Sequence, residues 1–386
     1  MRFFSVIAAG LALFAATPAL AGPTTLKSVE RYQGETSGRY IVKFKPGVSR
    51  RNYINRLKIK AAADWDILNG VAASLDEDTL NTLRASDDVE YITEDGIMTI
   101  QATQSNAPWG LGRLNQAGRL ANQATGSLAF NFTYDDSAGA GVDIYVLDTG
   151  VRVTHSQFGG RARWGTSFVG ASTDGHGHGT HCAGTAAGSQ FGVAKRANII
   201  AVQVLNSSGS GATSGIVSGL NWVLTQARNS GRPSVVSMSL GGSASTALDN
   251  AVAQLTSAGV HVVVAAGNSN TNAANTSPAR APSAITVAAS TIADAKASYS
   301  NYGAIVDVWA PGSNVISAWI GSDSATNSIS GTSMATPHVA GLVAYLIGRD
   351  GNVSPAAMAT KIINSSVNGA LSGVPSGTVN RLVQIR

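Results

Sequence analysis

The strongest constraint on the fold is a series of strand-length apolar segments that alternate with helix-like segments after residue 140. Six segments of six to nine residues are rich in Val, Ile, Leu and Ala. They span residues 142–148, 197–205, 235–240, 260–267, 284–290 and 306–312. Helical spacing of apolar residues appears at 214–230 and 246–259. Strands that are apolar on both faces and alternate with helices form a parallel sheet covered by helices. We therefore predict a three-layer α/β/α domain, with its chemistry at the carboxyl ends of the strands.

The distribution of charge changes near residue 100 and predicts a domain boundary there. Residues 22–102 contain 11 Lys or Arg and 12 Asp or Glu, whereas residues 103–386 contain 15 Lys or Arg, 10 Asp and no Glu. In the first region we expect strands at 39–47, 71–75 and 89–100, a helix at 50–63 capped by Ser49, and a second capped helix at 76–86. This order of elements indicates a small ferredoxin-like α+β domain.

The first 21 residues have the pattern of a secretory signal. Arg2 precedes an apolar run that ends in Ala19-Leu20-Ala21, which fits a small-x-small cleavage site. The alternative is a membrane anchor, but the run is short and Pro18 interrupts it. We therefore predict a secreted, extracellular protein with no membrane partner.

The chain carries a single cysteine, Cys182, so it can form no intrachain disulfide. Secreted proteins often depend on disulfides, and this one must instead depend on core burial and on bound ions. The formal net charge of +5 is modest and includes no basic run, so nothing indicates a nucleic-acid partner.

Three polar residues stand where a predicted strand ends or a predicted helix begins. Asp148 ends the segment 142–148, Asn268 follows the segment 260–267, and Ser333 begins an amphipathic helix. Between them, "DGHGHGTH" supplies His176, His178 and His181. Taken singly, the aspartate fits a turn, the serine fits a helix cap and the asparagine fits a turn. Three close histidines would also suit a metal ion, although no Cys, His or Glu cluster elsewhere completes such a site.

Taken together, these positions resemble the subtilisin-like serine proteases, most closely their proteinase K branch. The likeness rests on "YVLDTGV", "DGHGHGTHCAGT", "VVAAGNSN" and "SISGTSMATPHVAG", and it extends over nearly all of residues 104–380. The order of acid, base and nucleophile along the chain is that of subtilisin. The resemblance identifies residues 103–386 as a catalytic domain and 22–102 as an inhibitory propeptide, with cleavage between residues 100 and 106, near Ala102-Thr103.

The resemblance implies a role for each polar position. Ser333 is the nucleophile, His178 the general base and Asp148 the group that orients the imidazole. The Asn268 side chain and the Ser333 backbone N–H are expected to bind the oxyanion. The protein is then a broad-specificity endopeptidase acting on proteins and peptides, with its own propeptide as inhibitor, and we expect a monomer. The alternative from another class is a catalytically inactive binding protein of the same fold.

The resemblance also implies a substrate cleft and a cation site. Short Gly/Ser-rich segments at strand ends are expected to pair with extended substrate as added strands, and a small-residue wall predicts a roomy pocket that favours apolar or aromatic residues before the cut. The expected lining is Gly209, Ser210, Gly211, Ser239, Leu240, Gly241, Ala265, Ala266 and Gly267. A structural Ca²⁺ is implied at the carbonyls of Pro282 and Ala284 and the carboxylate of Asp307. A second, weaker site is impaired because Asn364 stands where the family has a carboxylate, and the family's disulfides are missing.

Cys182 has two interpretations, as a nucleophile or as a small buried hydrophobic residue. It lies four residues after His178, and we predict that it is a small buried hydrophobic residue rather than a nucleophile.

Overall fold

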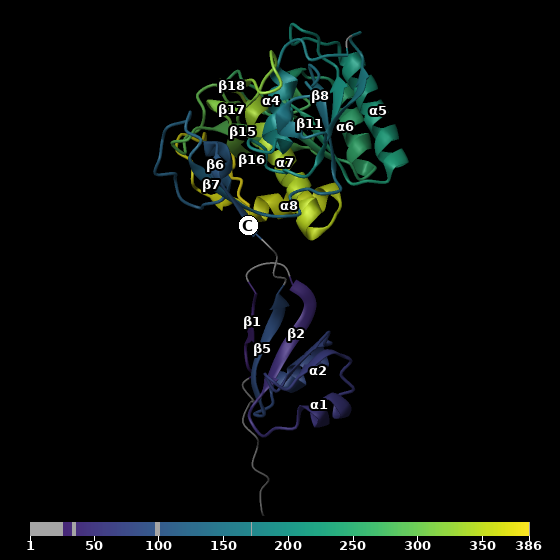
Figure 1. Ribbon diagram of the computed structural model, residues 1–386, viewed down its shortest axis with the longest axis vertical. Coiled ribbons are helices and arrows are strands. Elements are labelled where there is room, and N and C mark those ends of the chain that lie inside the picture. Colours follow the sequence, from purple (N-terminus) through teal and green to yellow (C-terminus); the bar gives the residue numbers. More distant parts are fainter. Residues whose placement is uncertain (1–25, 33–35, 97–100, 171, 386) are drawn as a thin grey trace, which may run out of the picture. The chain divides into compact units, whose positions relative to one another are not determined.

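The chain forms two compact units, Met1–Met98 and Thr99–Arg386 (Figure 1). The structure is a computed structural model that describes residues 26–32, 36–96, 101–170 and 172–385. The predicted signal segment at 1–21 lies outside these residues. The boundary between the units falls close to the change in charge.

The N-terminal unit is a five-stranded sheet with two helices. Its elements are β1 (Val29–Glu30), β2 (Thr36–Phe44), α1 (Arg50–Arg56), β3 (Ala61–Trp65), β4 (Gly70–Ala73), α2 (Glu77–Arg84) and β5 (Val89–Gly96). The strand order is β1-β5-β2-β4-β3, antiparallel except for the β1–β5 pair. The order β2-α1-β3-β4-α2-β5 confirms the predicted ferredoxin-like fold. One face of the sheet buries residues such as Val42, Phe44 and Ile92 against the helices.

The helix predicted over 50–63 is wrong in its second half. Helix α1 ends at Arg56, Lys58 adopts a left-handed φ of 52°, and the alanines from Ala61 belong to β3. Pairing of β3 with β4 overrides the helix propensity of those alanines. Ser49 begins α1 but its side chain makes no capping hydrogen bond. In α2, by contrast, Asp76 accepts from the Thr79 N–H as a capping residue does.

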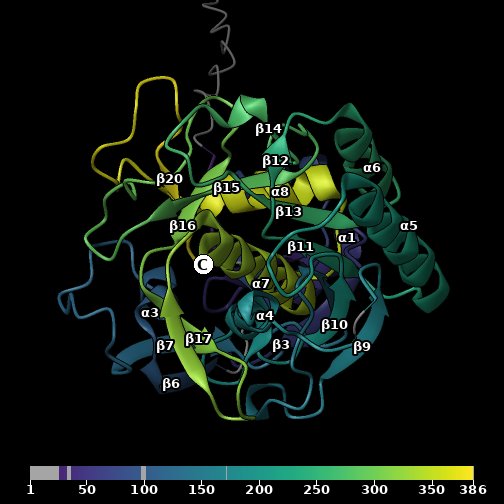
Figure 2. The same cartoon turned by 90° about the horizontal axis from the view of Figure 1, so that it is seen from above.

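The C-terminal unit is built on a nine-stranded sheet in the order β19-β20-β16-β15-β13-β11-β8-β10-β9 (Figure 2). Every neighbouring pair is parallel except β19–β20. The strands are β8 (Asp143–Asp148), β9 (Ala162–Ser167), β10 (Asn198–Gln203), β11 (Ser234–Met238), β13 (His261–Ala265), β15 (Ile285–Ser290), β16 (Val308–Pro311), β19 (Val367–Asn368) and β20 (Arg381–Leu382). All six predicted strands are therefore present. The edge strands β9 and β19, and β20 next to β19, were not predicted because they are short or contain charged and polar residues.

Alternate residues of the central strands enter two separate cores. In β8, Ile144 and Val146 pack with helices α4 (His178–Ala187) and α7 (Thr332–Asp350), whereas Tyr145 and Leu147 pack with α5 (Thr213–Ser230) and α6 (Thr246–Ser257). Figure 2 shows α5 and α6 side by side along the outer layer, with α7 beneath the strands. Both faces of the sheet are buried, as the apolar strands predicted. The layers are α/β/α, and helices α5 and α6 match the segments 214–230 and 246–259.

Smaller elements complete this unit. They are β6 (Gln101–Ala107), α3 (Trp109–Leu114), β7 (Phe130–Asp135), η1 (Ser156–Phe158), β12 (Gly242–Ser243), η2 (Ala273–Asn275), β14 (Thr276–Ser277), β17 (Val315–Ala318), β18 (Thr326–Ile329) and α8 (Pro355–Ser365). The predicted cleavage site Ala102-Thr103 lies in β6, where both residues pair with β7, while residue 100 of the predicted region lies outside the described residues.

Candidate active site

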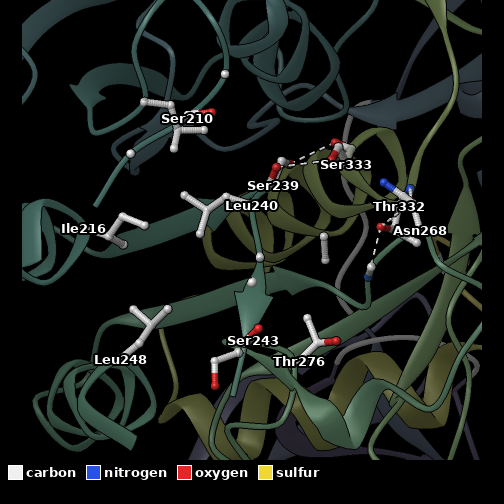
Figure 3. A pocket seen from close by; sticks show the side chains of 18 of the residues that line it. Ser210, Ile216, Ser239, Leu240, Ser243, Leu248, Asn268, Thr276, Thr332 and Ser333 are labelled. Atoms are coloured by element: carbon white, nitrogen blue, oxygen red, sulfur yellow. Dashed lines mark hydrogen bonds between the residues drawn. The ribbon is translucent and has the colours of Figure 1, made fainter. Parts of the chain in front are cut away.

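A cleft of about 1040 Å³ opens along the carboxyl ends of β8, β11 and β13. Its lining includes His178, Ser333, Asn268 and residues that follow each of these strands. Figure 3 shows Ser239, Ser333, Thr332 and Asn268 gathered at one end of the pocket. Ile216 and Leu248 lie at the other end of the pocket, and Leu240 lies between them and Ser239 (Figure 3). Polar groups therefore converge at the strand ends, where a parallel sheet places its chemistry.

His178 and Asp148 are hydrogen-bonded to each other, with Asp148 buried and His178 partly exposed to the cleft. The His178 Nδ1 lies 2.8 Å from Asp148 Oδ1 and 2.9 Å from Oδ2, and Asp148 is fully buried. The Asp148 carboxylate also accepts from the Thr149 N–H at 2.7 Å. Gly179 permits this approach, because a Cβ there would lie 2.1 Å from the Gly150 carbonyl oxygen. Burial of the imidazole opposes its protonation, but the Asp148 carboxylate and, after it, the neighbouring Cys182 together outweigh burial and raise the pKa of His178 well above its ordinary value.

The loop that carries His178 is held by Asp174, a residue that the sequence analysis missed. The buried Asp174 carboxylate accepts from the hydroxyls of Thr149 and Thr180 and from the backbone N–H groups of residues 176, 177 and 180. These five hydrogen bonds fix the start of α4, where His178 is the first residue. An Asp followed by glycines, which is typical of the turn before a helix, was the signal that could have identified it.

The three clustered histidines do not converge on one point. His181 is buried and its Nε2 lies 2.9 Å from the Val315 carbonyl oxygen, and burial lowers its pKa to about 3. His176 is exposed at the rim of the cleft. Rings that point in different directions do not provide the convergent ligands of a zinc site.

Ser333 stands in the first turn of α7, next to a serine from another strand end. Its hydroxyl donates to the Ser239 carbonyl oxygen at 3.1 Å, and the Ser239 hydroxyl donates to the Ser333 carbonyl oxygen at 2.8 Å. The hydrogen bonds of the described residues include none between the Ser333 hydroxyl and His178. Catalytic hydrogen bonds are often long or misaligned without substrate.

The Asn268 amide is oriented by Thr332. Its Oδ1 accepts from the Thr332 N–H at 2.8 Å and from the Thr332 hydroxyl at 2.9 Å (Figure 3). Because both hydrogen bonds go to the oxygen, the amide nitrogen is left as a donor beside Ser333. Asn268 is exposed to the cleft.

The predicted substrate-binding segments line the cleft with one exception. Eight of the nine residues lie on its wall: Gly209, Ser210, Gly211, Ser239, Leu240, Gly241, Ala265 and Gly267. Ala266 faces away from the cleft into a small core with Ala288 and Trp309. In an extended segment successive side chains point to opposite sides. The prediction included the three consecutive residues 265–267, so the middle one faces the core.

Cys182 lies behind the His178 ring. Its Sγ is 3.9 Å from His178 Nδ1 and 3.4 Å from the Ser333 carbonyl oxygen, to which it donates. Ligand atoms of Asp148, His178 and Cys182 all lie within 4.8 Å of one another, a grouping that could hold a metal. Burial raises the pKa of the Cys182 thiol, which disfavours the thiolate that a metal ligand requires.

The residues expected to hold calcium lie on adjacent chain segments. The Asp307 Oδ2 accepts from the Thr286 N–H at 2.8 Å, and the Asp307 N–H donates back to the Thr286 carbonyl oxygen at 3.0 Å. This pair holds Asp307 beside Thr286, which follows Ala284 by two residues and Pro282 by four along the chain. Burial raises the pKa of Asp307 to about 6, so a neighbouring cation would stabilise its charged form. One carboxylate and two carbonyl groups are oxygen ligands of the kind Ca²⁺ prefers, so the residues fit the ion.

An α/β/α domain with a buried Asp–His pair beside a serine at a helix start is the architecture of a serine peptidase. The sequence profile of the subtilase family matches residues 139–381, and that of peptidase inhibitor I9 matches residues 60–101. The chain belongs to the subtilase family, and it is a serine peptidase with an inhibitor-type N-terminal domain. Among the described residues, no helix is long and apolar enough to cross a membrane.

Several characterised proteins are similar to most of the chain. A cuticle-degrading protease of Metarhizium anisopliae is 47% identical over 353 residues, which cover 89% of this chain and 88% of that protein. Proteinase R of Parengyodontium album is 46% identical over 360 residues, covering 91% of this chain and 89% of that protein. The crystal structure of a cold adapted subtilisin-like serine proteinase is 46% identical with a TM-score of 0.66, covering 72% of this chain and 98% of that one.

Proposed function

We propose that this protein is a secreted endopeptidase of broad specificity, in which Ser333, His178 and Asp148 catalyse acyl transfer. The observation that carries the proposal is the hydrogen bond from the buried Asp148 to His178, which lines the same cleft as Ser333 and Asn268. Ser333 Oγ attacks the scissile carbonyl carbon, and His178 takes the hydroxyl proton and later gives it to the leaving amine. Asp148 holds the imidazole by Nδ1, so that Nε2 faces the serine, and stabilises the imidazolium. The hydroxyl must exchange its Ser239 acceptor for Nε2 when substrate binds.

The tetrahedral oxyanion is bound by the Asn268 amide nitrogen and the Ser333 backbone N–H. Both donors are fixed before substrate arrives, and fixed donors stabilise charge that develops in the transition state. Removal of such an amide in subtilisin lowers kcat by about 10²–10³-fold. We expect Asn268→Ala to lower kcat by a similar factor.

Substrate binding is proposed to occur by strand addition between the segments 209–211 and 239–241. These segments supply backbone groups with few bulky side chains, so affinity comes mainly from main-chain hydrogen bonds. The pocket beside Ala265 and Gly267 is uncharged, which favours apolar or aromatic residues before the cut. A peptide-library profile dominated by Arg or Lys at that position would contradict this specificity.

Three further properties are proposed from the sequence and the resemblance. The signal pattern at residues 1–21 supports secretion, and the inhibitor-type domain supports an autoprocessed zymogen cleaved near Ala102-Thr103. A structural Ca²⁺ bound by Pro282, Ala284 and Asp307 would tie two strand ends together. N-terminal sequencing of the secreted enzyme tests the first two properties at once.

Labelling with a fluorophosphonate tests the catalytic proposal. The mature enzyme should be modified on Ser333 alone, and mass spectrometry of the labelled peptide identifies the site. The Ser333→Ala variant serves as the control, since it should fold, remain unlabelled and hydrolyse nothing. A wild-type protein that folds but takes no label would instead favour the inactive binding protein.

A further inference from the structure

We propose that Asn301 is a positioning residue that fixes the backbone on both sides of Asn268 and thereby holds the oxyanion donor in place. The inference rests on the oxyanion role proposed for Asn268. Asn301 lies in a loop after β15, yet only 2% of its surface is exposed. A polar amide buried this fully in a loop requires partners for each of its groups.

Asn301 makes five hydrogen bonds to the segment that contains Asn268. Its Oδ1 accepts from the N–H groups of Ser269 and Thr271, each at 3.0 Å, and from the Thr271 hydroxyl at 3.3 Å. Its Nδ2 donates to the Ala266 carbonyl oxygen at 2.8 Å, and its backbone N–H donates to the Gly267 carbonyl oxygen at 2.9 Å. The partners lie at 266, 267, 269 and 271, so they flank position 268 on both sides.

The backbone at Gly267 lies in close contact with the Asn301 side-chain amide. A Cβ at Gly267 would lie 2.4 Å from Asn301 Nδ2, and Gly267 has a φ of +104° that other residues rarely adopt. Glycine is therefore required here both for space and for conformation. Such a close fit leaves the chain before Asn268 little freedom to shift.

Two sets of contacts then act on different parts of Asn268. Asn301 holds the neighbouring backbone, whereas Thr332 binds the side-chain oxygen. With Cα and Oδ1 both fixed, the amide nitrogen has one position in the cleft. Oxyanion stabilisation depends on such a fixed donor, and a misplacement of about 1 Å can cost on the order of 10²-fold in rate.

The position requires an amide rather than a carboxylate. Aspartate has the same shape and keeps the three acceptor contacts, but it cannot donate to the Ala266 carbonyl oxygen. It would also introduce a buried negative charge behind the site where the oxyanion forms. A cation also contacts this loop, since the Lys296 Nζ donates to Asn270 Oδ1 at 2.7 Å.

The test compares Asn301→Asp with wild-type mature enzyme, processed in trans by wild-type enzyme where its own processing is slow. We expect kcat to fall about 10–100-fold with KM nearly unchanged. Affinity for a peptide boronate, whose tetrahedral adduct places an oxygen at the oxyanion position, should fall by the same factor. Affinity for a product peptide should not change. A purely structural role would lower the melting temperature without this selective effect.

A double-mutant cycle with Asn268→Ala distinguishes the possible failures. If Asn301 acts through Asn268, Asn301→Asp should have little further effect on kcat once Asn268 is alanine. If Asn268→Ala alone leaves kcat unchanged, the proposed oxyanion role itself is wrong. The positioning role is wrong if Asn268→Ala lowers kcat but Asn301→Asp lowers kcat by the same factor in the wild-type and Asn268→Ala enzymes. It is also wrong if Asn301→Asp raises KM and leaves kcat unchanged.

Two further variants serve as a control and as an alternative test. Asn270→Gly removes the contact with Lys296 from the same loop and suits the positive φ of residue 270, so it should leave kcat unchanged. Asn301→Ser retains a short acceptor and replaces Asn301→Asp if that variant fails to fold. It should show the same selective loss of kcat and of boronate affinity, and an unaltered boronate affinity would overturn the inference.

Discussion

The charge state of His178 determines how the proposed mechanism responds to pH. The general base must be neutral to accept the Ser333 proton, and the Asp148 carboxylate raises the pKa of His178 well above its ordinary value. We therefore expect kcat/KM to increase with pH through this raised pKa and to be low in acid, where the ring is protonated. Measuring kcat/KM on a small peptide substrate from acid to alkaline pH gives this acidic limb of the pH profile, whose midpoint reports the pKa of His178.

The Asp148→Asn variant tests the cause of the raised pKa. Removing the negative charge stabilises the neutral ring, so the limb should move to lower pH. Activity should also fall about 10⁴-fold, as it does for the equivalent change in trypsin, because the amide favours the wrong tautomer. A limb that stays in place would show that another group raises the pKa.

The Asp174 carboxylate is expected to contribute to the stability of the fold. Asp174→Ala leaves five donors around the start of α4 without their acceptor, several of them buried. We expect a loss of about 2–4 kcal/mol in unfolding free energy. Denaturant unfolding in the Ser333→Ala background avoids autolysis, and Asp174→Asn, which keeps one acceptor oxygen, should lose less. Equal losses in both variants would argue against the hydrogen bonds as the cause.

At the scale of elements, helices α4 and α7 cross at a glycine contact. A Cβ at Gly341 of α7 would lie 2.5 Å from the Ala186 carbonyl oxygen and 2.9 Å from the Val193 Cβ. Alanine usually stabilises a helix by about 1 kcal/mol over glycine, but overpacking here costs about 1–3 kcal/mol. Gly341→Ala should therefore lower the melting temperature. In contrast, Gly215→Ala in α5 meets only ordinary contacts near 3.8 Å and should not.

The elements that the sequence predicted well are those with a buried pattern of their own. The six central strands are apolar on both faces, and α5 and α6 carry a clear apolar stripe, so burial and propensity agree. The prediction for 50–63 failed because pairing with β4 decides the structure of residues 61–65, and pairing cannot be read locally. Thr332 and Asn301 were missed for the same reason, since their partners lie in the segment 266–271, which is distant from both in sequence. Asp174 differs, because four of its five donors lie at residues 176–180 and its role had a local signal.

At the scale of the whole molecule, stability has to come from packing and from any bound ion, since Cys182 is the one cysteine of the chain. The proposed Ca²⁺ would bind the native fold and not the unfolded chain. It would therefore stabilise the native fold by a free energy that rises with the logarithm of the ratio of the Ca²⁺ concentration to Kd. We expect EDTA to lower the melting temperature of the Ser333→Ala protein and added Ca²⁺ to restore it.

Asp307→Asn gives this prediction its control. The amide keeps the size of the side chain but loses the negative charge that Ca²⁺ requires, so the variant should melt at a lower temperature in Ca²⁺ and respond little to EDTA. Asp323→Asn changes an exposed carboxylate that accepts from Arg152 and Thr154 and has no hydrogen bond to the expected calcium ligands, so it should keep the full EDTA response. If wild-type melting is insensitive to EDTA, or if Asp307→Asn responds as wild type does, no stabilising ion is held at Asp307 and the fold depends on packing alone.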